Sequence, residues 1–300
     1  MTDGRGRAVA SVLGAATLFG TTGTAQALGP SGTTPLGVGA ARIVIGGGGL
    51  LAVLPLLGGS RRDALALWRT RWGLLAGVTT AAYQVFFFAG VARAGVALGT
   101  LVTIGSGPVL TGLLSWAALR ERPRRSWVLA TSVCVVGLGL LVTAGTNGAG
   151  ADPWGLVFAL ASGLGYAVYT VAAKRLMNAG HRSDEVMTAA FALGGLLLLP
   201  VLVTQPSAWL TEPDGLAMAL WLGLATTTVA YVLFGRGLRH LPAGPVTTLV
   251  LAEPVVATIL GVAVLGETLP PVGWIGAGLV LAGLALQGVA ATRRGGESPP

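Results

Sequence analysis

The most regular feature of this sequence is the alternation of long apolar blocks with short clusters of charged residues. Each block is long enough, at about 20 residues, to cross a hydrocarbon layer of about 30 Å as a helix. The intervals between blocks leave no room for a separate soluble domain. We therefore predict an all-α integral membrane protein of ten transmembrane helices. The ten blocks are residues 8–28, 34–57, 72–92, 96–118, 126–145, 154–173, 187–204, 215–235, 243–265 and 271–291.

The composition agrees with this prediction. Hydrophobic residues make up 53% of the chain and charged residues 10%, and the mean hydropathy is +0.76. One globular core could not bury so much apolar surface, so lipid is the expected surroundings. The single cysteine, Cys134, excludes an internal disulfide and a multi-cysteine metal cluster, and we expect no metal site and no cofactor.

The positions of the basic residues predict the orientation. Ten spans place both termini on one side, and 17 of the 19 basic residues fall on that side. Arg93 alone falls on the opposite side, and Arg42 lies within a block. Because basic residues favour the cytoplasmic side, we expect cytoplasmic termini in the cell membrane. The same placement makes the net charge of +8 a topology signal, so we expect membrane lipid and no nucleic acid as a partner.

The first block could be mistaken for a secretory signal, because Arg5 and Arg7 precede it and Ala25-Gln26-Ala27 resembles a cleavage site. We expect it to be retained, since the tenfold pattern needs it.

The chain also resembles itself when it is shifted by 146 residues. This shift pairs Pro108 with Pro254 and Glu121 with Glu267. We therefore expect two five-helix repeats, residues 1–150 and 151–300. Because five is odd, the second repeat enters the membrane from the opposite side, and such inverted repeats are typical of secondary transporters.

The residues around the repeated prolines resemble a known family. Leu251-Ala252-Glu253-Pro254, followed by Gly266-Glu267-Thr268-Leu269, is similar to the ninth helix of EamA-type transporters of the drug/metabolite transporter superfamily. Gly107-Pro108 and Ala40-Ala41-Arg42 resemble equivalent parts of the first half. The resemblance implies a ten-helix bundle with a central cavity that exports or exchanges small metabolites, such as amino acids, nucleobase-like compounds or toxic cations.

Two charges fall within the apolar blocks. Glu253 lies near the middle of the ninth block and Arg42 at mid-depth of the second, and charges at such depth usually face protein or water. A buried carboxyl could exchange protons, so we consider proton coupling through Glu253 alongside a packing role. For Arg42, the alternative to a role in transport is a role in packing or in an ion pair. Pro108 and Pro254 are candidate helix bends, since each removes a backbone donor, and an inert kink is their alternative.

Polar and aromatic side chains at helical spacing are candidates for lining a substrate cavity. For each, interhelical packing is the alternative role. The candidates are Thr80, Gln84, Thr100, Thr103, Tyr166, Tyr169, Thr227, Tyr231 and Glu253.

These features favour a secondary transporter of a small-molecule substrate, most simply an exporter. The alternative is an integral membrane enzyme that acts on lipid-linked substrates. Such an enzyme should carry clustered His, Asp or Glu near one membrane face, and the sequence has no such cluster, so we expect no enzymatic activity. A non-catalytic membrane component is a third reading. The substrate, the coupling ion and the oligomeric state are left open by the sequence.

Overall fold

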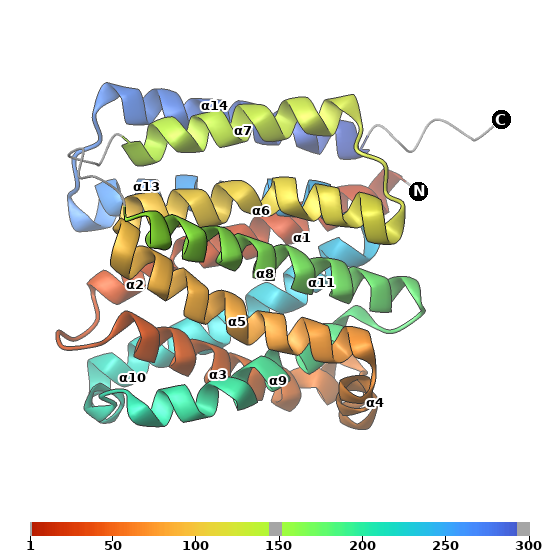
Figure 1. The fold of residues 1–300 in the computed structure, drawn as a ribbon, viewed down its shortest axis with the longest axis vertical. Coiled ribbons are helices and arrows are strands. Elements are labelled where there is room, and N and C mark those ends of the chain that lie inside the picture. The colour runs from red at the N-terminus through yellow and green to blue at the C-terminus, as the bar shows by residue number, and fades with distance from the viewer. Residues whose placement is uncertain (1, 144–151, 293–300) are drawn as a thin grey trace.

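The computed structural model describes residues 2–143 and 152–292, and within them every regular element is helical. Ten segments of the described chain are long and apolar enough to cross a membrane, so the predicted number of spans is confirmed. In Figure 1 these segments lie side by side, and the N-terminal residues and the end of α14 lie at the same end of the bundle, here called the terminal side.

We number the spans 1 to 10 in chain order. Six of them are single helices and four are divided into shorter elements. They are α1 (Thr2–Gly20) with α2 (Thr22–Ala27); α3 (Pro35–Val53) with the 3-10 turn η1 (Leu54–Leu57); α5 (Arg71–Ala94); α6 (Val96–Leu119); α7 (Arg125–Thr143); α8 (Pro153–Asn178); α9 (Ser183–Thr204); α10 (Pro213–Leu220), the π-helix η4 (Trp221–Val229) and α11 (Ala230–His240); α12 (Ala243–Leu249) with α13 (Ala252–Leu265); and α14 (Pro271–Thr292). Short helices α4 (Arg61–Ala66), η2 (Leu67–Arg69) and η3 (Ala208–Thr211) lie between spans.

Several spans begin at a residue that caps the helix. The hydroxyl of Thr34 accepts a hydrogen bond from the Gly37 amide at 3.1 Å, and Thr70 does the same for Gly73 at 3.0 Å. The Asp152 carboxylate accepts from the Trp154 amide at 3.0 Å at the start of α8. These side chains satisfy amides that the first turn of a helix leaves without partners, and they fix where the spans begin.

The outer surface of the bundle is apolar. Trp116, Trp154 and Trp274 are each more than half exposed, as are many Leu, Val and Ile side chains. Such a surface would be costly in water and suits contact with lipid tails. Together with the ten spans, it makes the chain a multi-pass membrane protein.

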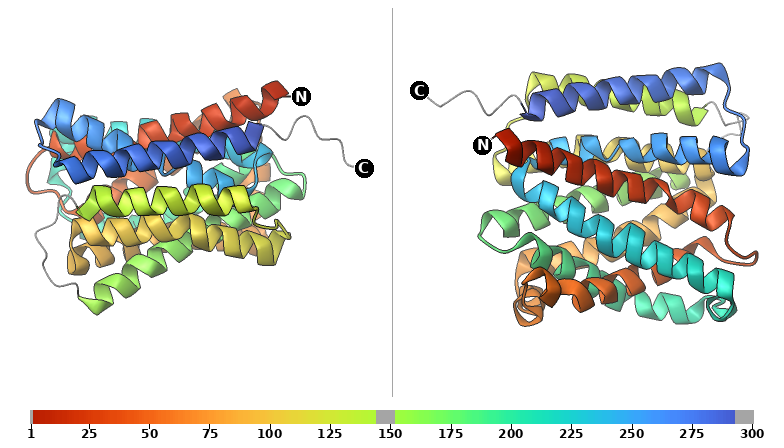
Figure 2. Two further views of the ribbon diagram at one scale, coloured as in Figure 1. Left: turned by 90° about the horizontal axis from the view of Figure 1, so that it is seen from above. Right: turned by 180° about the vertical axis from the view of Figure 1, so that it is seen from behind.

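The helices pack in pairs that follow the 146-residue shift. Helix α5 packs against α8 and α1 against α11, while α7 packs against α14. The last pair lies side by side along one edge of the bundle (Figures 1 and 2). The shift carries span 3, which is α5, to span 8, which contains α11. It likewise carries span 1, which contains α1, to span 6, which is α8. The contact between α5 and α8 therefore corresponds to the contact between α11 and α1, and α7 corresponds to its own partner α14.

Local geometry repeats at the same offset. Arg120 and Gly266 both adopt left-handed backbone conformations at the ends of α6 and α13. The next amides, of Glu121 and Glu267, then donate to the carbonyls of Ser115 and Gly261 at 3.2 and 3.1 Å. These correspondences support the expected two-repeat organisation, which stays a prediction.

Candidate functional site

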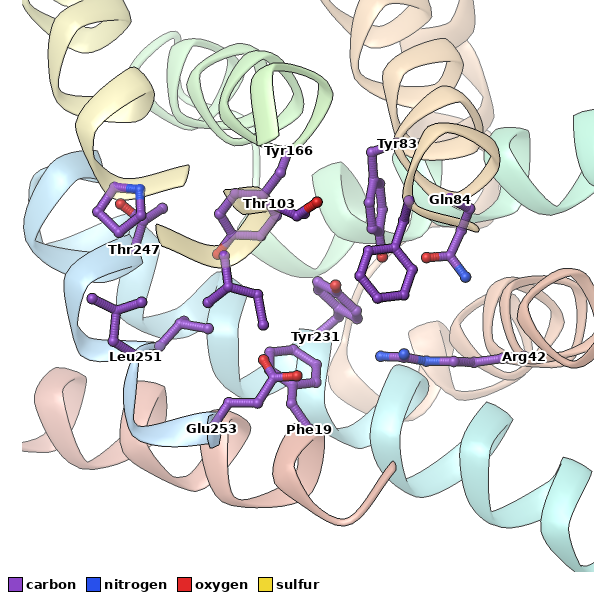
Figure 3. A pocket seen from close by; sticks show the side chains of 14 residues that line it. Phe19, Arg42, Tyr83, Gln84, Thr103, Tyr166, Tyr231, Thr247, Leu251 and Glu253 are labelled. Atoms are coloured by element: carbon purple, nitrogen blue, oxygen red, sulfur yellow. The ribbon is translucent and has the colours of Figure 1, made fainter. Parts of the chain in front are cut away.

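A cavity of about 120 Å³ lies near the middle of the bundle. Gln84, Pro108 and Tyr166, which line it, each stand close to the centre of their spans. Its walls combine aromatic rings, a few hydroxyls and amides, one cation and one carboxylate (Figure 3). The lining residues are Phe19, Arg42, Tyr83, Gln84, Phe87, Thr103, Ile104, Pro108, Tyr166, Tyr231, Thr247, Val250, Leu251 and Glu253.

Seven residues singled out in the sequence meet at this cavity. They are Arg42, Gln84, Thr103, Pro108, Tyr166, Tyr231 and Glu253.

The other candidates lie elsewhere. Thr80 is fully buried, where its hydroxyl donates to the Ala76 carbonyl at 2.8 Å. Tyr169 is buried behind the wall with its ring stacked on Tyr83, and Thr100 is not among the lining residues. Thr227 does not line the cavity, but its hydroxyl accepts a hydrogen bond from Arg42, which does.

The two repeated prolines behave differently. Span 9 is broken between α12 and α13, just before Glu253 and Pro254. Proline cannot donate to the carbonyl four residues earlier. That carbonyl, of Val250, instead accepts from the Glu253 amide at 2.9 Å, in a tighter turn. In contrast, α6 continues through Pro108 without a break, so only Pro254 coincides with an interruption.

The break determines where Glu253 lies. This residue is in the first turn of α13, near the centre of the span, and its carboxylate points into the cavity (Figure 3). The start of a helix favours negative charge, because its amides point toward the group. Among the described residues, no hydrogen bond or ion pair to this carboxylate is present.

Arg42 is positioned by the π-helical segment η4. Its Nε donates to the Thr227 hydroxyl at 3.1 Å and its Nη2 to the Thr226 carbonyl at 3.3 Å. The Thr227 hydroxyl itself donates to the carbonyl of Leu222, five residues earlier, at 3.0 Å. The guanidinium also stands over the Phe19 ring, 6.0 Å from its centre. Arg42 is therefore held along one edge, and its remaining N–H groups are directed toward the cavity (Figure 3).

All four tyrosines of the chain gather here. Tyr166 lies 5.3 Å from Tyr169 and 6.4 Å from Tyr83, and Tyr169 lies 6.4 Å from Tyr231, measured between ring centres. The hydroxyl of Tyr166 is buried without a hydrogen-bond partner. It therefore has no described protein partner in this conformation.

Sequence reasoning missed seven lining residues: Phe19, Tyr83, Phe87, Ile104, Thr247, Val250 and Leu251. One signal could have found Tyr83. Tyrosine in membrane proteins is enriched at the interfaces, yet all four here lie well inside apolar blocks. The apolar lining residues carry no such signal, because similar side chains also face lipid.

A second cluster ties helices together on the terminal side of the bundle. The Lys174 ammonium donates to the carbonyls of Leu238, Arg239 and Leu241, at 2.7, 3.2 and 2.9 Å. These three carbonyls belong to the last turn of α11 and the residue that follows it. The ammonium thus uses all three of its N–H donors at the junction between α11 and α12.

Glu121 holds the other side of this junction. Its carboxylate accepts from the Ala243 amide at 3.0 Å, at the start of α12. Burial raises the pKa of the Glu121 carboxyl, while the Ala243 amide and the charge of Lys174 oppose this rise. The junction is therefore fixed to α8 by Lys174 and to the loop after α6 by Glu121.

Within residues 2–143 and 152–292, no group of three or more His, Cys, Asp or Glu side chains could hold a metal ion.

A bundle of ten apolar spans around a central cavity with two opposite charges defines a multi-pass membrane protein of the transporter class. The profile of the EamA-like transporter family matches residues 6–143 and again residues 153–288, and the chain belongs to this family.

Two relatives are named as transporters. The uncharacterized transporter YwfM of Bacillus subtilis (strain 168) is 40% identical over 273 residues, which cover 91% of this chain and 90% of that protein. The threonine/homoserine exporter RhtA of Escherichia coli (strain K12) is 28% identical over 265 residues, which cover 79% of this chain and 85% of that protein. Such relatives imply a small-molecule substrate.

A solved crystal structure shares the fold. It has a TM-score of 0.80 and 23% sequence identity, and the match covers 96% of this chain and 98% of that one.

Proposed function

We propose that this protein is a secondary transporter that exports small metabolites or drug-like solutes, with amino acids or related compounds foremost, across the cytoplasmic membrane. The observation that carries the proposal is the central cavity, into which two opposite charges point from different spans. Drug-sized ligands generally need pockets of about 300–1,000 Å³, so the smaller cavity favours a metabolite. The similarity to RhtA, a threonine/homoserine exporter, supports the same class of solute.

The transport cycle follows from the two expected repeats. Residues 1–150 and 151–300 form two five-helix units of inverted topology, and exchanging their conformations opens the cavity to alternate sides. The matching helix pairs and the matching turns after α6 and α13 support this division. Arg42 comes from the first unit and Glu253 from the second, so the binding site spans both.

Proton coupling through Glu253 completes the proposal. Its carboxylate faces the cavity from the break in span 9, where a ligand or a proton can reach it. A carboxyl in such a place can hold either a proton or a cationic group of the substrate. Export can then be driven by the proton gradient.

The orientation rests on charge. The topology predicted from the sequence assigns 17 basic residues to the side of both termini, which supports a cytoplasmic location for that side.

Reconstitution tests the proposal directly. Purified protein in liposomes should exchange a labelled amino acid against the same unlabelled compound, and an outward proton gradient, with the lumen acidic, should accelerate its accumulation. Liposomes that contain the Arg42→Gln variant serve as the control. Absence of flux for every amino acid and every drug-like solute in a broad panel would overturn the proposal.

A further inference from the structure

Arg42 and Glu253 present opposite charges to one cavity, and neither forms an ion pair with a described residue. Their nitrogen and oxygen atoms are more than 4.0 Å apart, since they form no ion pair. We propose that the cavity binds a zwitterion, with the substrate carboxylate on Arg42 and the substrate ammonium on Glu253. This inference rests on the proposed transport function and specifies its substrate class.

The geometry of Arg42 assigns it to an anion. Two of its five N–H donors are used by Thr227 and Thr226, and both partners are neutral. A guanidinium within a membrane span pairs with acidic groups or with backbone carbonyls, because an isolated buried charge is costly, and Arg42 has only the neutral kind of partner. The bound edge fixes the plane of the guanidinium. Its free donors are then suited to a carboxylate, which can accept two parallel hydrogen bonds from arginine.

The geometry of Glu253 assigns it to a cation. The carboxylate offers acceptors only, and no described donor satisfies them. The amide of the same residue is already used by Val250, so the carboxylate projects from a fixed turn. A primary ammonium carries three donors and fits an acceptor of this kind.

A singly charged ligand would fit less well. A carboxylate alone would leave an ionised Glu253 without a cationic partner in the cavity, and an ammonium alone would leave Arg42 without an anionic one. Removing one partner of a buried pair leaves an uncompensated charge, which is the more costly arrangement. A zwitterion supplies a counter-charge to Arg42 and to Glu253 at the same time.

The remaining lining describes the rest of the ligand. Phe19, Tyr231 and Ile104 offer apolar surface, while the Thr103 hydroxyl, which donates to the Ala159 carbonyl at 3.1 Å, can still accept a hydrogen bond. This combination suits a short aliphatic side chain with one polar group. It gives no counter-charge for a second cation or anion on the ligand.

The experiment measures binding to the purified full-length protein. The twenty common L-amino acids are screened by thermal shift, and the strongest ligand is then compared with its own amide and its own N-acetyl derivative. The amide lacks the carboxylate and the N-acetyl compound lacks the ammonium. We expect each to bind at least about tenfold more weakly than the amino acid, which is the effect of losing about 1.4 kcal/mol.

Two variants separate the two contacts. Arg42→Gln should bind the amide and the amino acid equally but still reject the N-acetyl compound, and Glu253→Gln should show the opposite selectivity. Glu267→Gln, which changes an exposed acid outside the spans, should keep the wild-type pattern. If a variant does not fold, the wild-type comparison of the three ligands still decides.

Two results overturn the inference. One is equal binding of the amino acid and either blocked derivative by the wild-type protein. The other is that no amino acid binds. Flux of a singly charged solute through liposomes in either case would retain the transporter proposal while rejecting the zwitterion.

Discussion

Arg42 and Glu253 line the same cavity from different spans, and they do not form an ion pair with each other. Arg42 is held by span 8 through two hydrogen bonds, whereas Glu253 is held only by the turn at the start of α13. The arginine is therefore held in place by hydrogen bonds of its side chain, whereas no described residue holds the carboxylate. This difference makes the carboxylate the better candidate for a group that changes partner during transport.

Glu253→Gln should fold normally and lose its response to a proton gradient. Glutamine has nearly the shape of the protonated acid, so packing is kept, but it cannot release a proton. We expect a melting temperature close to that of the wild type, and a flux in liposomes that no longer depends on the imposed pH difference. A stable variant that keeps the wild-type dependence on the gradient would make Glu253 a packing residue.

Gly46→Ala should impair the site through Arg42. A methyl group at Gly46 would meet the side chain of Thr227, which holds the Arg42 guanidinium. Overpacking of this kind typically costs about 1–3 kcal/mol. We expect a lower melting temperature and weaker substrate binding, measured on the same preparation.

Gly48→Ala is the matched control for this substitution. Gly48 lies on the same helix, but nothing lies within 4 Å of its added methyl group. Alanine is the better helix former by about 1 kcal/mol, so stability should stay the same or rise. Equal losses in both variants would show that the contact with Thr227 is irrelevant.

Glu121→Gln should change how stability depends on pH. Burial raises the pKa of this carboxyl, so the folded protein binds its proton more tightly than the unfolded chain does. The resulting stabilisation is fully present below the unfolded pKa and is lost as pH rises through the folded pKa. Glutamine does not titrate and can still accept the Ala243 amide.

The measurement is a series of melting temperatures from about pH 4 to about pH 8, compared between variant and wild type. The melting temperature of the variant should increase relative to that of the wild type as pH rises. Glu267→Gln serves as the control, because it replaces the exposed acid that the 146-residue shift pairs with Glu121. An advantage that instead shrinks toward neutral pH would contradict the assignment.

Lys174→Met should loosen the terminal side of the bundle. It removes three hydrogen bonds to the carbonyls at the end of α11 and leaves them without a charged donor. We expect the free energy of unfolding to fall by about 2 kcal/mol or more. A cysteine placed at Thr247 should also react faster with a thiol reagent applied from the cytoplasmic side.

Arg175→Met provides the comparison, since this neighbouring side chain is exposed and donates one hydrogen bond, to the Ala118 carbonyl at 2.8 Å. Removing this hydrogen bond should lower the free energy of unfolding by less than about 1 kcal/mol. A similar loss for both variants would argue against a special role for Lys174.

The predicted topology can be tested with single cysteines. Cys134 is buried, and its thiol lies 3.6 Å from the Val280 carbonyl, so it should react slowly with polar reagents. Cysteine at the exposed Ser207 should be labelled on intact cells. Cysteine at the exposed His181 should be labelled only after the membrane is opened. The reverse pattern would invert the proposed orientation.

The number of the spans and most of their approximate limits followed from sequence, because hydrocarbon thickness sets one simple length. The predicted block 72–92, for example, lies within α5 at Arg71–Ala94. The block 187–204 began too late, since α9 starts at Ser183 with Asp184 and Glu185 in its first turn. Acidic residues in the first turn favour a helix, although they lower the local hydropathy that marked the block.

The cavity was harder to predict, because its shape depends on how spans pack. Periodicity indicated Gln84 and Tyr231, yet it could not distinguish Thr103, which lines the cavity, from Thr80, which is buried between helices. The π-helical turns of η4 were also invisible in the sequence, and they alter the spacing on which such reasoning relies. The break at Pro254 could be anticipated from proline chemistry, but the continuity of α6 through Pro108 could not.

Trp127 lies next to the break in span 9, where its fluorescence can be used as a probe. Its indole donates to the Thr248 hydroxyl at 3.1 Å, and Thr248 stands at the end of α12, just before the interruption. Four other tryptophans, Trp116, Trp154, Trp221 and Trp274, are exposed on the outer surface, where the local surroundings change little when helices shift inside the bundle. Trp127 is thus placed as a native fluorophore beside the break between α12 and α13, and its emission would report on this region once the seven other tryptophans are replaced by phenylalanine.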